Sequence, residues 1–147
     1  MEKLKAEELL QLRRFVGRWN TKGVLRTSDK MHGEIVTGTD TYEWLAGEYF
    51  LLHKADVYIG KEKNQTYEII GFDNKIGKFT MQHYDSKGST GLMLAECKKD
   101  DWEFIGDDLR FRGGFKNDDK EFSGIWEQRT KDSNWEIFMD ITLIRAD

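Results

Sequence analysis

The sequence predicts an all-β fold, an antiparallel up-and-down meander of about ten strands that closes into a barrel behind a short N-terminal helix. Three observations lead to this prediction. Apolar and polar residues alternate over most of the chain after Gly17. Turn-forming residues recur about every ten positions, and no helical period separates the strands. The 147 residues include no proline, so no strand loses a backbone donor to that residue.

The first element is a short amphipathic helix over residues 5–16, in which Leu9, Leu12 and Val16 form one apolar row. From Gly17 onward the apolar period is two. The breaks between strands are short stretches rich in Gly, Asn, Asp and Ser, at 28–30, 46–47, 60–64, 73–74, 85–88, 98–101, 106–108, 117–119 and 132–134. No linker or change of composition divides the chain, so residues 1–147 are expected to form one domain.

Alternation along four strands predicts which side chains face the barrel interior, because successive residues of a strand point to opposite sides. The inward set is Trp19, Thr21, Gly23 and Leu25, then Leu109, Phe111, Gly113 and Phe115, then Phe122, Gly124, Trp126 and Gln128, and finally Trp135, Ile137, Met139, Ile141, Leu143 and Arg145. The segment 33–45 has no consistent pattern, and we assign it no face. The pair Gly113-Gly114 within a strand predicts a bulge or bend.

Composition argues against several classes of function. The net charge of −4 disfavours a nucleic-acid surface, which needs a basic patch. No apolar run approaches the roughly 20 residues of a membrane-spanning helix, so no membrane partner is expected. An acidic N-terminus unlike a signal peptide and a single cysteine, Cys97, predict a cytoplasmic protein. The sequence contains no phosphate loop, nucleophile elbow or paired-cysteine motif.

Three features together resemble the calycin superfamily: Gly17-x-Trp19 after a short helix, the meander, and Arg145 on the last strand. Within it, the chain is similar to nitrobindin-like and other bacterial lipocalin-like barrels of unknown function. The motifs that carry this similarity are Gly71-Phe72-Asp73, Tyr84-Asp85-x-x-Gly88 and Trp126…Asp132-x-x-Trp135. The resemblance implies a lipocalin-like barrel in which Arg145 packs across Trp19 at the closed end, a structural cation–π pair. The alternative role for Arg145 is to bind an anionic ligand.

The nitrobindin likeness also raises haem, which those proteins hold through a histidine near the C-terminus. This sequence has only His32, His53 and His83, and none lies on the last two strands. Met139 faces inward, but a methionine on an apolar strand face is far more often core than an iron ligand. We therefore expect no haem and no other cofactor. Nor does any spacing supply a third ligand for a metal site with the histidines.

The candidate site is the barrel interior, because eight strands already enclose room for one small ligand and ten enclose more. Alternation places His53 and His83 inward and leaves His32 at the surface. With Gln128, the two inward histidines are the polar groups that would orient a guest. In the other interpretation they are hydrogen-bonded residues of a partly hydrated cavity. The expected apolar wall consists of Met81, Phe111, Trp126, Met139 and Ile137.

The expected function is non-enzymatic binding of a small hydrophobic molecule. One alternative is a barrel enzyme acting on a small aromatic or hydrophobic acid, with Tyr49, Tyr67 or Tyr84 and Glu96 as candidate site residues. An enzyme should show an inward carboxylate with a shifted pKa, and a carrier an apolar cavity with few polar anchors. Another alternative is a barrel filled by its own five tryptophans and nine phenylalanines, with an interaction role only. A homodimer could form through the outward residues Ile125, Phe138 and Ile144.

Overall fold

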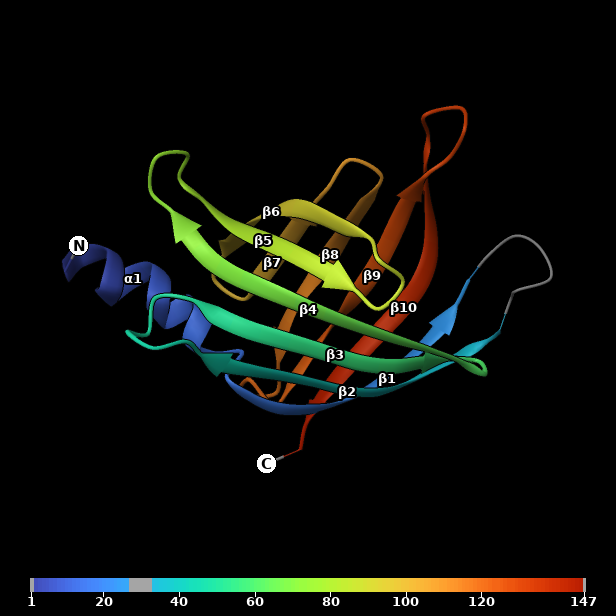
Figure 1. Ribbon diagram of the computed structural model, residues 1–147, viewed down its shortest axis with the longest axis horizontal. Helices are drawn as coiled ribbons and strands as arrows, with labels where there is room; N and C mark the ends of the chain where they lie inside the picture. Colours follow the sequence, from blue (N-terminus) through green and yellow to red (C-terminus); the bar gives the residue numbers. More distant parts are fainter. Residues whose placement is uncertain (1, 27–32, 147) are drawn as a thin grey trace.

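The computed structural model describes residues 2–26 and 33–146 as one closed antiparallel barrel with a helix at one end (Figure 1). Its elements are α1 (Glu2–Arg13), β1 (Gly17–Leu25), β2 (Ile35–Trp44), β3 (Leu51–Ile59), β4 (Glu62–Asp73), β5 (Lys78–Asp85), β6 (Thr90–Lys98), β7 (Asp101–Ile105), β8 (Leu109–Lys116), β9 (Glu121–Arg129) and β10 (Trp135–Arg145). Each strand pairs with the next one in sequence, and β1 pairs with β10 to close the barrel. The predicted all-β meander with a short N-terminal helix is confirmed.

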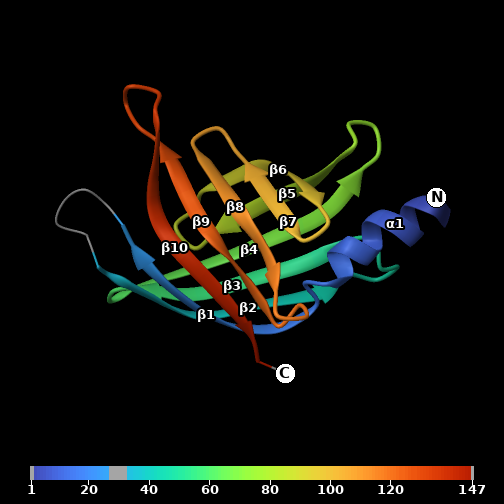
Figure 2. The same ribbon diagram turned by 180° about the vertical axis from the view of Figure 1, so that it is seen from behind.

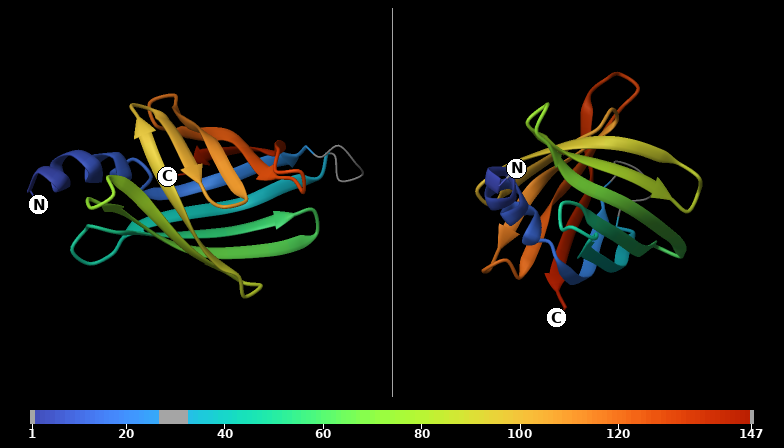
Figure 3. Two further views of the ribbon diagram at one scale, coloured as in Figure 1. Left: turned by 90° about the horizontal axis from the view of Figure 1, so that it is seen from above. Right: turned by 60° about the vertical axis from the view of Figure 1, so that its left-hand side comes forward.

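In Figures 2 and 3, α1 lies at one end of the barrel. Apolar side chains fill this end. Leu9 and Leu12, two residues of the predicted apolar row, are buried there. The helix ends at Arg13, earlier than predicted, and Phe15 in the following turn enters the barrel. Its ring centroid lies between 4.9 and 5.2 Å from those of four other aromatic side chains, Tyr42, Trp102, Phe115 and Phe122. Such tilted and edge-to-face contacts make this end a packed core.

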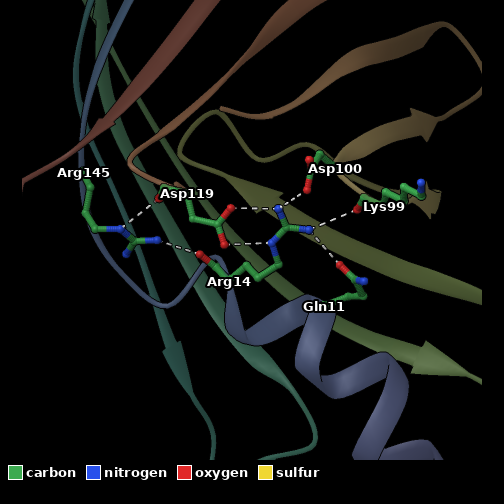
Figure 4. Close-up of polar contacts among 6 residues, drawn as sticks. All are labelled: Gln11, Arg14, Lys99, Asp100, Asp119 and Arg145. Atoms are coloured by element: carbon green, nitrogen blue, oxygen red, sulfur yellow. Dashed lines mark hydrogen bonds and ion pairs between the residues drawn. The ribbon is translucent and has the colours of Figure 1, made fainter. Parts of the chain in front are cut away.

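Arg14 joins the helix end to two turns of the barrel (Figure 4). Its guanidinium pairs with Asp119 in the β8–β9 turn at 2.8 Å and with Asp100 in the β6–β7 turn at 2.6 Å. The hydrogen bond from Arg14 holds the pKa of the Asp119 carboxyl below its ordinary value. Arg14 therefore links the end of α1 to the β6–β7 and β8–β9 turns.

Arg145 occupies the other side of the same end (Figure 4). Its guanidinium carbon lies 4.1 Å from the centroid of the Trp19 ring, so the predicted cation–π contact is present. Two of its nitrogens donate to the carbonyl oxygens of Arg14 and Val16, each at 2.7 Å, and a third donates to that of Asp119 at 3.2 Å. Each of its three nitrogens therefore already donates to a backbone carbonyl rather than to an anionic ligand.

A bulge in β10 corrects the predicted faces of that strand. The register with β9 shifts between Ile137 and Met139, so one extra residue inverts the alternation at this point. Trp135 pairs with Arg129, and the Arg110 guanidinium lies 4.3 Å from its ring on the outer face. The prediction that Trp135 and Ile137 face inward is therefore wrong. Beyond the bulge, Met139 faces the interior as predicted.

The pair Gly113-Gly114 does not form the predicted bulge, since the registers of β8 with both neighbours run unbroken. Gly113 instead lies opposite Gly124, and the Phe111 ring packs over both. A Cβ atom at Gly113 would lie 2.6 Å from Phe111 Cζ, and one at Gly124 would lie 2.7 Å from the same atom. A Cβ atom at either position would also lie 2.2 Å from a backbone oxygen of the facing strand, so the glycines allow both the close approach of β8 and β9 and the packing of the ring.

Candidate functional site

Away from α1, the barrel interior contains a cavity of about 360 Å³. Every strand contributes at least one side chain to its wall, and it extends to the strand ends at Ile59, Asp85 and Leu109. Most of the wall is aliphatic, aromatic or thioether in character. The volume lies near the lower end of the range of about 300–1,000 Å³ that small-molecule pockets occupy. The interior is therefore packed at one end and hollow at the other, and the filled-barrel interpretation describes only the end next to α1.

Most of the predicted site residues lie together in this wall. The lining residues include His53, His83, Met81, Phe111, Trp126 and Met139, all predicted to face inward. The exceptions are Gln128, which is not among the lining residues, and Ile137, which the β10 bulge places on the outer face. The polar partners of His53 are Asp40 on β2 and Glu68 on β4.

A row of polar side chains crosses the inner face from β1 to β5. The strand registers produce it, since residues directly opposite in an antiparallel pair share a face. His53 on β3 lies opposite Tyr42 on β2 and opposite Glu68 on β4. Glu68 in turn lies opposite His83 on β5. Asp40, two residues before Tyr42, completes the row next to His53.

His53 is held between two buried carboxylates. Its Nε2 donates to Asp40 Oδ1 at 2.6 Å, and its Nδ1 donates to Glu68 Oε1 at 2.9 Å. The other Asp40 oxygen, Oδ2, accepts a hydrogen bond from the Thr21 hydroxyl. Asp40 and Glu68 are only 6% and 5% exposed, so both carboxylates depend on these partners rather than on solvent.

Both ring nitrogens can donate at once only in the imidazolium form. Burial lowers the pKa of His53, but the hydrogen bonds to Asp40 and Glu68 outweigh burial and raise that pKa to about 9. His53 is therefore a cation at neutral pH, and the charges of the Asp40–His53–Glu68 cluster sum formally to −1. The Tyr42 ring stacks on the imidazolium at a centroid distance of 4.0 Å with only 6° between the planes. Burial raises the pKa of the Tyr42 hydroxyl well above its ordinary value, so this phenol stays neutral.

Glu68 and His83 each keep one polar atom without a hydrogen bond to a described residue. Glu68 uses Oε1 for His53, and no described side chain or backbone group pairs with its Oε2. The Nδ1 atom of His83 is buried and has no partner within the described residues. The His83 ring lies over Gly91, where a Cβ atom would be 2.9 Å from the ring carbon Cε1. Two neighbouring polar groups of the wall are therefore incompletely satisfied.

Sequence reasoning missed the two carboxylates. Asp40 lies in the segment 33–45, whose residues we could not assign to the inner or outer face from the sequence. The segment does alternate, because threonines occupy positions 37, 39 and 41, between Val36, Gly38, Asp40 and Tyr42. The threonines face outward on β2, which turns Asp40 inward. Glu68 gave no comparable signal, because an isolated glutamate in a strand is normally expected on the solvent side.

The residues considered for an enzyme site do not come together in the interior. Tyr67 and Tyr84 lie opposite each other on the outer face and are 54% and 53% exposed. Glu96 forms an exposed ion pair with Lys78. His32 lies outside the described residues.

Two kinds of feature are absent from the described residues. In that part of the chain, no helix combines the length and apolar character needed to cross a bilayer. The same residues contain no group of three or more histidine, cysteine, aspartate or glutamate side chains arranged to hold a metal ion. The Asp40–His53–Glu68 cluster is consistent with this, since a protonated imidazole is not a metal ligand.

Comparisons with known proteins identify the fold and the family. The chain is similar to the crystal structure of Rv2717c from M. tuberculosis, with a TM-score of 0.70, 12% identity, and coverage of 96% of this chain and 98% of that one. A de novo designed fluorescence-activating β-barrel has a TM-score of 0.41 and 13% identity over 91% of this chain and 95% of the design. At 12% identity, the likeness to Rv2717c concerns the fold alone. A search of curated proteins found no match. The family model of a protein of unknown function, DUF1579, matches residues 5–145, and the chain belongs to this family.

Proposed function

We propose that this barrel binds a small, largely apolar molecule in its interior without transforming it. The observation that carries the proposal is the cavity of about 360 Å³ inside the closed barrel, with one polar row in an otherwise apolar wall. Apolar walls with a few placed polar groups are typical of ligand pockets. Met81, Met93 and Met139 line the cavity, and flexible thioether side chains adapt to ligand shape.

An acid–base enzyme is the second candidate, favoured by the inward carboxylates and the raised pKa of His53. The contacts of His53 argue for binding instead. A general base needs a free ring nitrogen, and a general acid needs an N–H directed at the substrate. Both His53 nitrogens are engaged by Asp40 and Glu68, so neither can exchange a proton with a substrate unless a hydrogen bond breaks.

The proposal also includes what the sequence led us to expect about cofactors, partners and location. Haem stays disfavoured, because β9 and β10 carry no histidine and the His53 nitrogens are both in use. We expect no nucleic acid or membrane partner, and a cytoplasmic location. A homodimer through the outer face near Ile144, which is 45% exposed, remains part of the proposal.

The test starts with native mass spectrometry of the protein as purified from cells, together with an absorbance scan. Titration with N-phenyl-1-naphthylamine, a neutral dye that fluoresces in apolar surroundings, then measures binding to the emptied protein. In the variant Ala55→Phe a ring would fill the cavity, because Ala55 lines it. The matched control is Lys54→Phe, which adds the same ring at the adjacent, exposed position.

We expect wild type and Lys54→Phe to bind the dye, and Ala55→Phe to lose at least about tenfold in affinity while keeping its unfolding midpoint. Equal binding by Ala55→Phe would place the dye outside the barrel and contradict the proposal. Absence of dye binding by wild type, with no retained molecule in the mass spectrum, would also contradict it. A Soret band in the absorbance scan would overturn the expectation about haem.

A further inference from the structure

We propose that the molecule bound in the cavity is a monocation, an amine on an apolar body whose ammonium group is bound by Glu68. This inference rests on the proposed binding function and adds the chemical class of the ligand. Two features of the cavity wall lead to it: the balance of its charges and the free oxygen of Glu68.

The charged groups of the wall favour a cation over an anion. Among the described lining residues there is no lysine or arginine, whereas Asp40, Glu68 and Asp85 are all present. The cation in the polar row is His53, and both of its N–H groups already donate to carboxylates. A ligand carboxylate would therefore meet negative charge with no charged donor free to bind it. Aromatic and hydrophobic acids, the substrates considered for an enzyme, are the class that this wall disfavours.

The free acceptor in the row is one oxygen of Glu68. Asp40 uses both of its oxygens, one for His53 and one for Thr21. Glu68 uses Oε1 for His53, and its Oε2 has no partner among the described residues. A carboxylate that is 5% exposed gains considerably from another donor, because solvent cannot supply it fully. A ligand N–H placed at Oε2 would complete its hydrogen bonding.

His83 is the neighbour of Glu68 in the polar row, but it is not a second anchor for the ligand. It lies directly opposite Glu68, and such pairs place the two Cβ atoms about 4.5–5.5 Å apart. Its Nδ1 has no partner in the described part of the chain, but this atom is buried, so a ligand in the cavity does not reach it. An ammonium group offers up to three donors, of which one is enough for Glu68 Oε2. It would also cancel the formal excess charge of −1 in the Asp40–His53–Glu68 cluster.

The test compares three ligands that share one apolar body and differ in charge. They are 1-naphthylmethylamine, a cation at neutral pH, 1-naphthalenemethanol, which is neutral, and 1-naphthaleneacetic acid, an anion. Isothermal titration calorimetry at pH 7 with the full-length protein gives the three dissociation constants. We expect the amine to bind at least about tenfold more tightly than the alcohol, and the acid to bind most weakly.

The outcomes separate the two proposals. If alcohol and amine bind equally, or if the acid binds most tightly, the cavity is a binding site but the inference about a cation is wrong. If none of the three binds and the neutral dye does not bind either, both proposals fail. The wild-type comparison alone decides between these outcomes, so it does not depend on any variant folding.

Glu68→Gln tests the assigned anchor. It removes the charge but keeps a side-chain oxygen that can accept from His53. We expect the preference for the amine over the alcohol to disappear in this variant, with alcohol binding retained. Glu103→Gln is the matched control, since Glu103 is an exposed carboxylate on the outer face of β7. An unchanged preference in Glu68→Gln would show that Glu68 does not bind the ammonium group.

Discussion

Raising the pH from 6 to 10 should deprotonate His53 and weaken the fold. The pKa of this side chain is about 9 in the folded protein, against an ordinary value of 6.5 that applies to the unfolded chain. The folded state therefore holds the proton more tightly than the unfolded state. The stabilisation is fully present below about pH 6.5 and is lost as the pH rises through about 9.

The size of the effect follows from the difference between the two pKa values. The difference between a pKa of about 9 and one of 6.5 corresponds to about 3 kcal/mol at most, since a tenfold change in proton affinity is about 1.4 kcal/mol. At pH 7 most of it, about 2.5 kcal/mol, is still present. Domains of this kind are typically stable by about 5–15 kcal/mol, so the loss is large enough to measure.

The assay is urea unfolding at intervals between pH 6 and pH 10, combined with an NMR titration of the imidazole carbons. Cys97→Ala is the suitable background, because burial raises the pKa of the Cys97 thiol and would add its own dependence in the same range. Because the chain has three histidines, the variants His32→Gln and His83→Gln together identify the His53 signal by elimination. A midpoint near 6.5 for His53, or a stability that does not change between pH 7 and pH 10, would refute the account of the Asp40–His53–Glu68 cluster.

Three substitutions test the packed end of the barrel by urea unfolding. Arg145→Lys keeps the charge but loses the planar group that binds backbone carbonyls and covers Trp19, and should cost about 2–3 kcal/mol. Arg14→Gln should cost only about 1 kcal/mol, because its carboxylate partners are partly exposed, but it should speed amide exchange in α1. Gly124→Ala should cost about 1–3 kcal/mol or more, because its Cβ atom would lie 2.7 Å from Phe111 Cζ.

Neighbouring exposed positions provide the controls for the two arginines. Arg112→Lys and Arg13→Gln should each change stability by less than about 0.5 kcal/mol. If Arg145→Lys is as mild as Arg112→Lys, the bonds of Arg145 to backbone carbonyls do not hold the barrel end. If Arg13→Gln and Arg14→Gln affect amide exchange in α1 equally, the ion pairs of Arg14 do not anchor the helix. A stable Gly124→Ala would mean that both the Phe111 ring and the β8 backbone at Arg112 can move aside.

The fold was predictable because most strands obey strict alternation. Trp19, Thr21 and Leu25 on β1 are buried as that rule requires. The prediction failed on β10, where one extra residue inverts the alternation and the neighbouring sequence does not indicate it. The extra residue between Ile137 and Met139 satisfies the pairing of β9 with β10, which alternation within one strand does not reveal.

The cavity wall was only partly predictable, for a related reason. Apolar lining residues such as Met81 and Trp126 follow from alternation, because their own chemistry favours the interior. Asp40 and Glu68 face inward because His53 compensates their charge, and His53 lies on the strand between them. That compensation depends on the register of β2, β3 and β4. The inward orientation of the two carboxylates can therefore be inferred only once the pairing of these strands is known.

The separation between a packed end and a hollow end bears on how sequences with this fold can diverge. Substitutions around Phe15 disturb several ring contacts at once, so natural selection should remove them because they destabilise the fold. Substitutions in the cavity wall remove fewer contacts, so selection can act there on ligand choice while folding is preserved. Directed evolution of this barrel for a new ligand should therefore accumulate its changes toward the ends of β3, β5 and β8 near Ile59, Asp85 and Leu109, and leave the helix end as it is.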